Sequence, residues 1–270
     1  LLLGGNVNSS TVDKGDNNAP FENKRTETDY LPIADPFVML YNNKYYAYGT
    51  GGTVNEGFAC FSSDDLKNWK RERQALSADD SYGKWGFWAP EVYYIQSKKK
   101  FYMFYSVEEH ICVATSDSPV GPFRQESKQP IWEEKSIDTS LFIDDDGTPY
   151  LYFVRFTDGN VIWVAQMTDD LMKIKKETLS ECIKAEEPWE LLQAKVAEGP
   201  SLLKKNGVYY LIYSANHYEN KGYGVGYATS DTPMGPWVKY SKNPLLQGDA
   251  ATGLVGTGHG APFQCKDGSW

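Results

Sequence analysis

Five widely spaced stretches of the sequence each place an acidic residue or a histidine beside a proline, a glycine or another small residue. These residues are Asp35, Glu91, Asp138, Glu198 and His259. Cleavage of a glycosidic bond requires two carboxyl groups, because one must protonate the leaving oxygen while the other acts as base or nucleophile. A third, ionised carboxylate nearby raises the proton affinity of the acid. Asp35, Asp138 and Glu198 could fill these three roles if the fold brings them together.

Some of these residues alone also have a plain structural explanation, although Glu198, followed by Gly199 and Pro200, is less easily explained as a turn residue. Asp35 precedes Pro36 and could simply start a strand, and Asp138 could bond nearby backbone amides. Glu91 lies two residues after Ala89, the first residue of its segment, so it could support a site or contact substrate rather than react. The chemical interpretation therefore depends on whether the five segments converge in space.

The five segments share one pattern, in which the polar residue leads into apolar residues, a turn and an aromatic-rich strand. They begin at Ala34, Ala89, Asp138, Glu198 and His259. Four of them carry Asn-Asn, Asp-Gly or Asn-Gly turns, at 42–43, 146–147, 206–207 and 267–268. These dipeptides tolerate positive φ and close hairpins tightly. Each segment is therefore predicted to form a β-hairpin.

A second motif follows four of the hairpins and adds a third strand, a polar turn and a short return strand. It begins at Cys60, Val113, Val164 and Tyr227. Three to four strands per unit, repeated at roughly 50 to 60 residues, predict an all-β, five-bladed β-propeller. A βαβ fold would need amphipathic helices that only 169–190 could supply, and a β-sandwich gives no reason for a fivefold repeat. In a propeller the inner strands line the axis, so the five residues should meet there.

The domain prediction places the propeller at 30–270 and a polar leader or linker at 1–29, which could help to close the ring. The fifth unit ends just after its turn at 267–268, so the fifth blade is expected to be incomplete. We expect a separate C-terminal fragment to supply its remaining strands.

Composition excludes several classes of protein. The formal net charge of −9 disfavours nucleic acid and anionic membrane partners. No apolar run approaches the roughly 20 residues that span a bilayer. The four cysteines show no ligand spacing for zinc, so we expect free thiols. The aromatic fraction of 14% favours strands, and most of these rings are expected to pack between blades.

Further side chains could contribute to a site at the axis. Phe37 and Trp88 lie near the starts of inner strands and could stack on sugar rings. Arg155 interrupts an apolar strand and could bond a substrate hydroxyl or tune a carboxylate. His259 sits among glycines, where it could bind a metal ion directly or through water.

Five motifs, in order, resemble glycoside hydrolase family 43 over nearly the whole chain from about Tyr30. They are Asp35-Pro36-Phe37, Trp88-Ala89-Pro90-Glu91, Ile137-Asp138-Thr139-Ser140, Ala197-Glu198-Gly199-Pro200 and Thr257-Gly258-His259-Gly260. The resemblance implies a five-bladed propeller that hydrolyses arabinose- and xylose-containing polymers with inversion. It implies Asp35 as general base, Asp138 as the carboxylate that tunes the acid and orients substrate, and Glu198 as general acid. It also implies that His259 helps to hold calcium or another cation at the axis.

The resulting expectation is an exo-acting α-L-arabinofuranosidase or exo-arabinanase, acting on arabinan, arabinoxylan or derived oligosaccharides without a cofactor for the chemistry. β-Xylosidase and endo-arabinanase activities, and a non-catalytic sugar-binding propeller, remain alternatives. A fructan-cleaving propeller enzyme with a retaining mechanism is a further alternative. Because plant polymers do not enter cells, a secreted or periplasmic enzyme is expected, with a cytoplasmic enzyme acting on imported oligosaccharides as the alternative.

Overall fold

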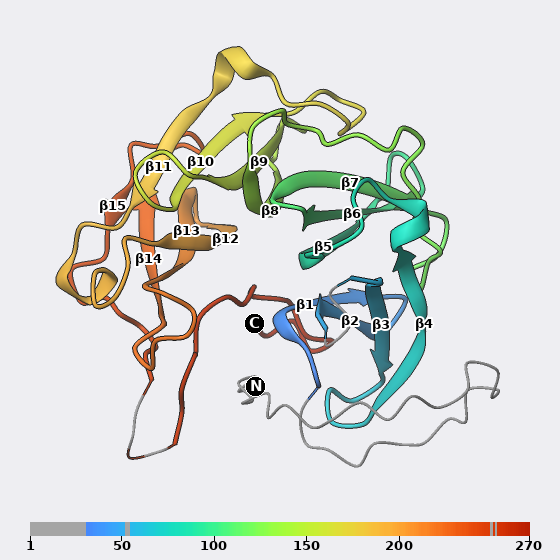
Figure 1. The fold of residues 1–270 in the computed structure, drawn as a ribbon, viewed down its shortest axis with the longest axis horizontal. Coiled ribbons are helices and arrows are strands. Elements are labelled where there is room, and N and C mark those ends of the chain that lie inside the picture. Colours follow the sequence, from blue (N-terminus) through green and yellow to red (C-terminus); the bar gives the residue numbers. More distant parts are fainter. Residues whose placement is uncertain (1–30, 52–54, 249–250, 252) are drawn as a thin grey trace.

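The computed structural model describes residues 31–51, 55–248, 251 and 253–270. The leader predicted at 1–29 lies outside these residues. The described chain folds into four antiparallel sheets arranged around a central axis (Figure 1). Three single-turn 3-10 helices accompany them: η1 (Ala78–Asp80), η2 (Lys176–Thr178) and η3 (Pro188–Glu190). Within the described residues, no helix has the length and apolar character needed to cross a membrane.

Each sheet is one propeller blade whose strands follow one another in chain order. Blade I comprises β1 (Ala34–Tyr41), β2 (Lys44–Thr50), β3 (Gly57–Ser63) and β4 (Trp69–Ser77). Blade II comprises β5 (Trp88–Ile95), β6 (Lys100–Val107) and β7 (His110–Ser116). Blade III comprises β8 (Ser136–Ile143), β9 (Pro149–Arg155), β10 (Val161–Gln166) and β11 (Ser180–Lys184). Blade IV comprises β12 (Ala197–Lys205), β13 (Val208–Ala215), β14 (Gly224–Ser230) and β15 (Val238–Lys239).

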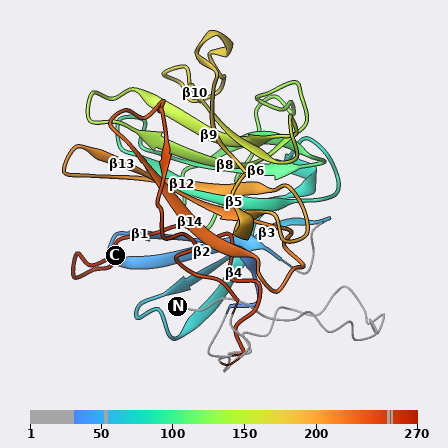
Figure 2. The same cartoon turned by 90° about the vertical axis from the view of Figure 1, so that its left-hand side faces the viewer.

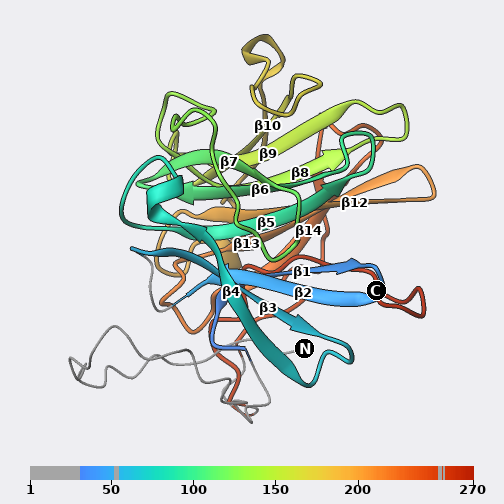
Figure 3. The same ribbon diagram turned by 90° about the vertical axis from the view of Figure 1, so that its right-hand side faces the viewer.

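The predicted all-β propeller is confirmed for four blades, and the inner strands β1, β5, β8 and β12 pack side by side around the axis. The predicted fifth hairpin forms no strand among the described residues. Its turn is present, because the Gly268 N–H donates to the Cys265 carbonyl at 2.9 Å. The segment lies along blade I instead, where the Phe263 ring is 6.2 Å from that of Tyr45 (Figure 3). A separate fragment that completes this blade stays a prediction.

The core lies between neighbouring blades, which stack as layers when seen from the side (Figure 2). Tyr48, Tyr105, Tyr152 and Tyr213 are fully buried there. The Tyr48 hydroxyl donates to the Pro119 carbonyl just after β7, and the Tyr152 hydroxyl donates to the Pro233 carbonyl between β14 and β15, both at 2.5 Å. The predicted packing role of the aromatic residues is thus confirmed. All four cysteines are free, also as predicted.

Candidate active site

A residue with left-handed backbone interrupts each inner strand near its start. In blades I to IV the pairing register shifts there, between Ala34 and Phe37, Trp88 and Glu91, Ile137 and Ser140, and Glu198 and Ser201. The left-handed residues are Asp35 (φ 47°), Ala89 (47°), Asp138 (56°), Gly199 (53°) and, in the fifth segment, His259 (53°). Positive φ is uncommon outside glycine, and a bulge of this kind turns a side chain in a new direction. The repeat therefore builds the same backbone feature five times around the axis.

This geometry refines the sequence alignment of the five segments. Asp35, Asp138 and His259 occupy the same left-handed position in their segments. Glu91 lies two residues after the equivalent Ala89, as predicted. Glu198 was predicted at the shared position, but it precedes the left-handed Gly199 by one residue, so it projects from the neighbouring strand position.

His259 brings the carboxylates of two blades together. Its Nδ1 atom lies 3.3 Å from Oδ1 of Asp35 and 3.7 Å from Oδ2 of Asp138. Burial alone would lower the pKa of His259, but the surrounding carboxylates, chiefly Asp138 and Asp35, raise it to about 9. His259 is therefore an imidazolium at neutral pH, and its charge offsets part of the repulsion between the two aspartates.

The Glu198 carboxyl group is held by one hydrogen bond on each oxygen. The Tyr223 hydroxyl donates to Oε1 and the Asn160 side-chain amide donates to Oε2, each at 2.8 Å. Burial and then the charge of Asp138 raise the pKa of Glu198 to about 7, although both hydrogen bonds and His259 oppose this shift. A carboxyl group with this pKa is protonated in about half of the molecules at neutral pH, which suits a general acid.

Asp138 and Asp35 lie in different environments. Asp138 is buried, and burial followed by the charge of Asp35 raises its pKa, against the effects of His259 and of the Gly199 N–H bond. Asp35 is only half-buried, and its Oδ2 accepts a hydrogen bond from Thr50 Oγ1 at 2.5 Å. The greater exposure of Asp35 allows a water molecule to reach it, as a general base requires.

Hydroxyl groups fix most of the left-handed residues. Thr50, Ser106 and Ser214 stand at equivalent places near the ends of β2, β6 and β13. Each accepts the backbone N–H of the next segment's left-handed residue: Ala89 at 2.9 Å, Asp138 at 2.9 Å and His259 at 2.6 Å. The fifth segment is thus docked at the axis like the others, although it forms no strand.

Glu91 and Phe37 line the axis beside this group. The Tyr93 hydroxyl donates to Glu91 Oε2 and accepts the Leu141 N–H at 3.1 Å, while the Phe37 ring lies 5.3 Å from the Tyr93 ring. Burial raises the pKa of Glu91 to about 7 despite its hydrogen bonds with Tyr93 and Ser140. The direct partner of Glu91 is therefore a tyrosine, and its predicted contact with substrate stays a prediction.

Trp88 and Arg155 have separate surroundings. Trp88 stands at the strand position equivalent to Glu198, half-buried, with its ring against Gly86. The Arg155 guanidinium donates to Glu134 Oε2 at 2.7 Å and lies 4.6 Å from the Trp163 ring. Arg155 therefore pairs on blade III rather than with the axial carboxylates, and its predicted substrate contact stays a prediction.

The predicted metal role of His259 stays a prediction. Nδ1 of His259 faces Asp35 and Asp138. The part of the chain that the structure describes contains no group of three or more His, Cys, Asp or Glu side chains able to hold a metal ion.

Sequence reasoning missed the residues that orient the reacting groups. Tyr223 and Asn160, which hold Glu198, come from loops outside the repeated motifs, and no spacing marks them. Thr50, which contacts Asp35, ends a strand whose other residues follow the repeat. One signal could have helped: Thr50, Ser106 and Ser214 place a hydroxyl group at equivalent strand positions. This equivalence becomes visible only once the strand register is known.

A propeller axis that gathers three carboxyl groups, one of them with a pKa raised to about 7, holds the groups that glycosidic cleavage requires. The chain matches the model of glycosyl hydrolases family 43 over residues 31–270, and it belongs to that family, whose members are inverting enzymes.

Known proteins resemble the chain to different degrees. A crystal structure titled endo-1,4-beta-xylanase, from Bacteroides thetaiotaomicron, is 90% identical, with a TM-score of 0.88 over 90% of this chain and 84% of that one. A beta-D-galactofuranosidase of Aspergillus niger is 28% identical, over 85% of this chain and 69% of its own length. An arabinoxylan arabinofuranohydrolase of Bacillus subtilis is 29% identical, over 78% of this chain and 50% of its own length.

Proposed function

We propose that the chain hydrolyses arabinose- and xylose-containing plant polysaccharides, or oligosaccharides derived from them, by a single displacement. The observation that carries the proposal is the half-buried Glu198, held by Tyr223 and Asn160, whose pKa of about 7 lets it donate a proton near neutral pH. Asp35 takes a proton from water, and the resulting hydroxide attacks the anomeric carbon. Glu198 protonates the departing oxygen as an oxocarbenium-like transition state forms. Asp138 helps to keep the proton on Glu198, and Nδ1 of His259 lies 3.3 Å from Oδ1 of Asp35.

The first candidate substrate is a terminal α-L-arabinofuranosyl group, released by exo action. The similarity to the arabinoxylan arabinofuranohydrolase supports this choice. The second candidate is a xylosyl linkage, which the name of the 90% identical Bacteroides thetaiotaomicron structure favours. Both candidates use the same three carboxyl groups, so the surrounding surface must select between them.

Incubation with aryl α-L-arabinofuranoside, aryl β-D-xyloside, linear arabinan and arabinoxylan tests these candidates. Product sizing separates exo from endo action, and the anomeric form of the first product, followed by NMR, tests inversion. We expect release of arabinose from the aryl arabinofuranoside and from arabinoxylan. Release of xylose alone would select the second candidate.

Binding without turnover on every substrate would instead identify a non-catalytic sugar-binding propeller. We also propose that the enzyme acts outside the cytoplasm, because polymeric substrates cannot cross the cell membrane. Fractionation of the producing cells tests this location, and recovery of the activity only in the cytoplasmic fraction would contradict it.

A further inference from the structure

The two loops that hold the Glu198 carboxyl group also carry exposed aromatic side chains. Asn160 belongs to the loop between β9 and β10, and Tyr223 ends the loop between β13 and β14. Phe156 opens the first loop and is 43% exposed. Tyr218 lies in the second loop and is 65% exposed. Two large apolar surfaces are thus attached to the segments that position the acid.

Both loops are held in place. The Asn160 N–H donates to the Lys195 carbonyl at 3.0 Å, and the Lys195 ammonium group pairs with Asp158 at 2.5 Å. The Tyr218 ring stacks on His217, with 4.8 Å between ring centroids and 23° between planes. The rings are therefore presented on ordered backbone, which lowers the entropy cost of binding a ligand.

A third segment adds apolar surface beside Tyr218. Leu191 and Leu192 are 43% and 56% exposed. Leu192 packs against Gly222 in the Tyr218 loop, where a Cβ atom on the glycine would lie 2.6 Å from Leu192 Cδ1.

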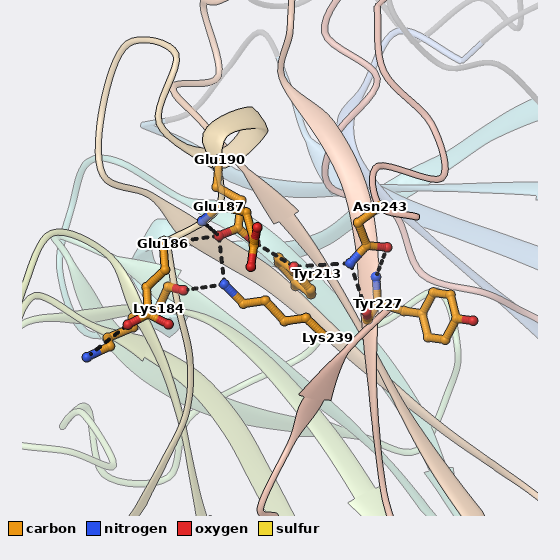
Figure 4. Close-up of polar contacts among 8 residues, drawn as sticks. All are labelled: Lys184, Glu186, Glu187, Glu190, Tyr213, Tyr227, Lys239 and Asn243. Carbon is orange, nitrogen blue, oxygen red and sulfur yellow. Dashed lines mark hydrogen bonds and ion pairs between the residues drawn. The ribbon is translucent and has the colours of Figure 1, made fainter. Parts of the chain in front are cut away.

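A buried carboxylate anchors the Leu191–Leu192 segment just before it begins (Figure 4). Glu190 is fully buried, and its side chain accepts hydrogen bonds from the Tyr213 hydroxyl and the Lys239 ammonium group, each at 2.6 Å. The backbone N–H groups of Glu186 and Glu187 donate to it at 2.7 and 2.8 Å. With all these partners the turn is fixed, so the two leucines that follow are held at the surface.

The chemistry of the acid determines which part of a substrate meets this surface. A general acid protonates the glycosidic oxygen, and that oxygen leaves with the sugars on the departing side of the bond. The surroundings of Glu198 therefore face the departing sugars. Tyr218 lies in the same loop as Tyr223, whose hydroxyl donates to Glu198 Oε1 at 2.8 Å.

We propose that Phe156, Leu191, Leu192 and Tyr218 form a leaving-group platform that binds the departing sugar residues. Sugar rings present apolar C–H faces, which pack well on the flat surfaces of Phe and Tyr. The platform rests on the proposed function and gives it a preference for substrates that continue beyond the cleaved bond.

Phe156→Ala, Tyr218→Ala and the double variant test the platform with two substrates that carry the same cleaved sugar. One is an oligosaccharide of three or more residues, and the other is the glycosyl fluoride, whose leaving group is a single atom. We expect kcat/KM on the oligosaccharide to fall about 3- to 10-fold for each ring. We expect kcat/KM on the fluoride to stay within about twofold of the wild type. Ile143→Ala is the matched control, because Ile143 is 42% exposed at the far end of β8.

Equal losses on both substrates, or no loss on the oligosaccharide, would overturn the platform. Failure of the proposed function looks different, since the wild-type protein would then hydrolyse neither substrate. A loss with the Ile143 control equal to that of the ring variants would also contradict the proposal.

Discussion

The backbone N–H of Gly199 donates a hydrogen bond to Oδ2 of Asp138, with 3.0 Å between the two atoms. The residues equivalent to Gly199 in three other segments are Ala89, Asp138 and His259. Each of them donates its backbone N–H to a hydroxyl group of the preceding blade. Here the equivalent residue of blade III is Val154, which offers no acceptor. The Asp138 carboxylate takes the place of that hydroxyl, and this ties it to the residue that follows Glu198.

Replacing Val154 with Thr should give Gly199 a competing acceptor. Asp138 would then lose a donor that lowers its pKa, carry less negative charge and repel Glu198 less, so the pKa of Glu198 should fall. We expect the basic limb of the kcat/KM pH profile to move to lower pH. The buried hydroxyl should also cost about 1–3 kcal/mol of unfolding free energy. Val154→Ala removes bulk without adding an acceptor, and an identical pH profile for both variants would refute the interpretation.

Glu198→Gln and Asp35→Asn should each lower kcat by about 10²- to 10⁴-fold while the fold is retained, because each removes a proton-transfer group. The two losses should separate on a glycosyl fluoride. Fluoride departs with little acid assistance, so Glu198→Gln should recover most of its activity there and Asp35→Asn should not. Steady-state kinetics on both substrates check this. Equal recovery of the two variants on the fluoride would contradict the assignment of Glu198 as the acid and Asp35 as the base.

Tyr223→Phe should raise the pKa of Glu198 above its value of about 7, because burial and Asp138 would then act with one opposing hydrogen bond fewer. The acid would stay protonated to higher pH, so the basic limb of the pH profile should move upward. Tyr209→Phe is a matched control, since it removes a tyrosine bond to a carboxylate, Asp144, in the hairpin of β8 and β9. A shift of the same size in both variants would mean that the effect is not local to Glu198.

The blades could be predicted because their signals are local. Asp146-Gly147 and Asn206-Gly207 close hairpins through their own backbone preferences, and the aromatic strands around them repeat at a fixed period. Convergence at the axis then followed from the topology. The same reasoning gave the two-residue offset of Glu91 from Ala89.

The remaining features of the site depend on tertiary contacts that no repeat encodes. Glu198 precedes the left-handed residue by one position because Gly199 takes the positive φ, and its holders Tyr223 and Asn160 come from unrelated loops. Arg155 ends β9 rather than interrupting it, and it packs on Trp163 of β10 and pairs with Glu134, contacts that the repeat does not predict.

Glu91→Gln should reduce the loss of stability that the wild-type protein shows as pH rises. Burial raises the pKa of Glu91 from 4.5 to about 7, so the folded state binds this proton more tightly than the unfolded state. The stabilising effect is complete below the unfolded pKa and disappears as pH rises through about 7. We expect the variant to gain on the order of 1–3 kcal/mol relative to wild type between about pH 5 and pH 8. Denaturant unfolding at both pH values measures this, with exposed Glu177→Gln as control.

Gly199→Ala should damage the site beyond its backbone strain. Gly199 has φ of 53°, and a Cβ atom there would lie 2.9 Å from Cγ of His259. A left-handed alanine costs about 1–2 kcal/mol on its own. The added methyl must also push the imidazole away from Asp35 and Asp138. We therefore expect both kcat and the free energy of unfolding to fall. Gly207→Ala shares the strain, with φ of 78°, but meets no atom within 4 Å. Equal kcat for the two variants would show that the Gly199 contact with His259 does not position the catalytic carboxylates.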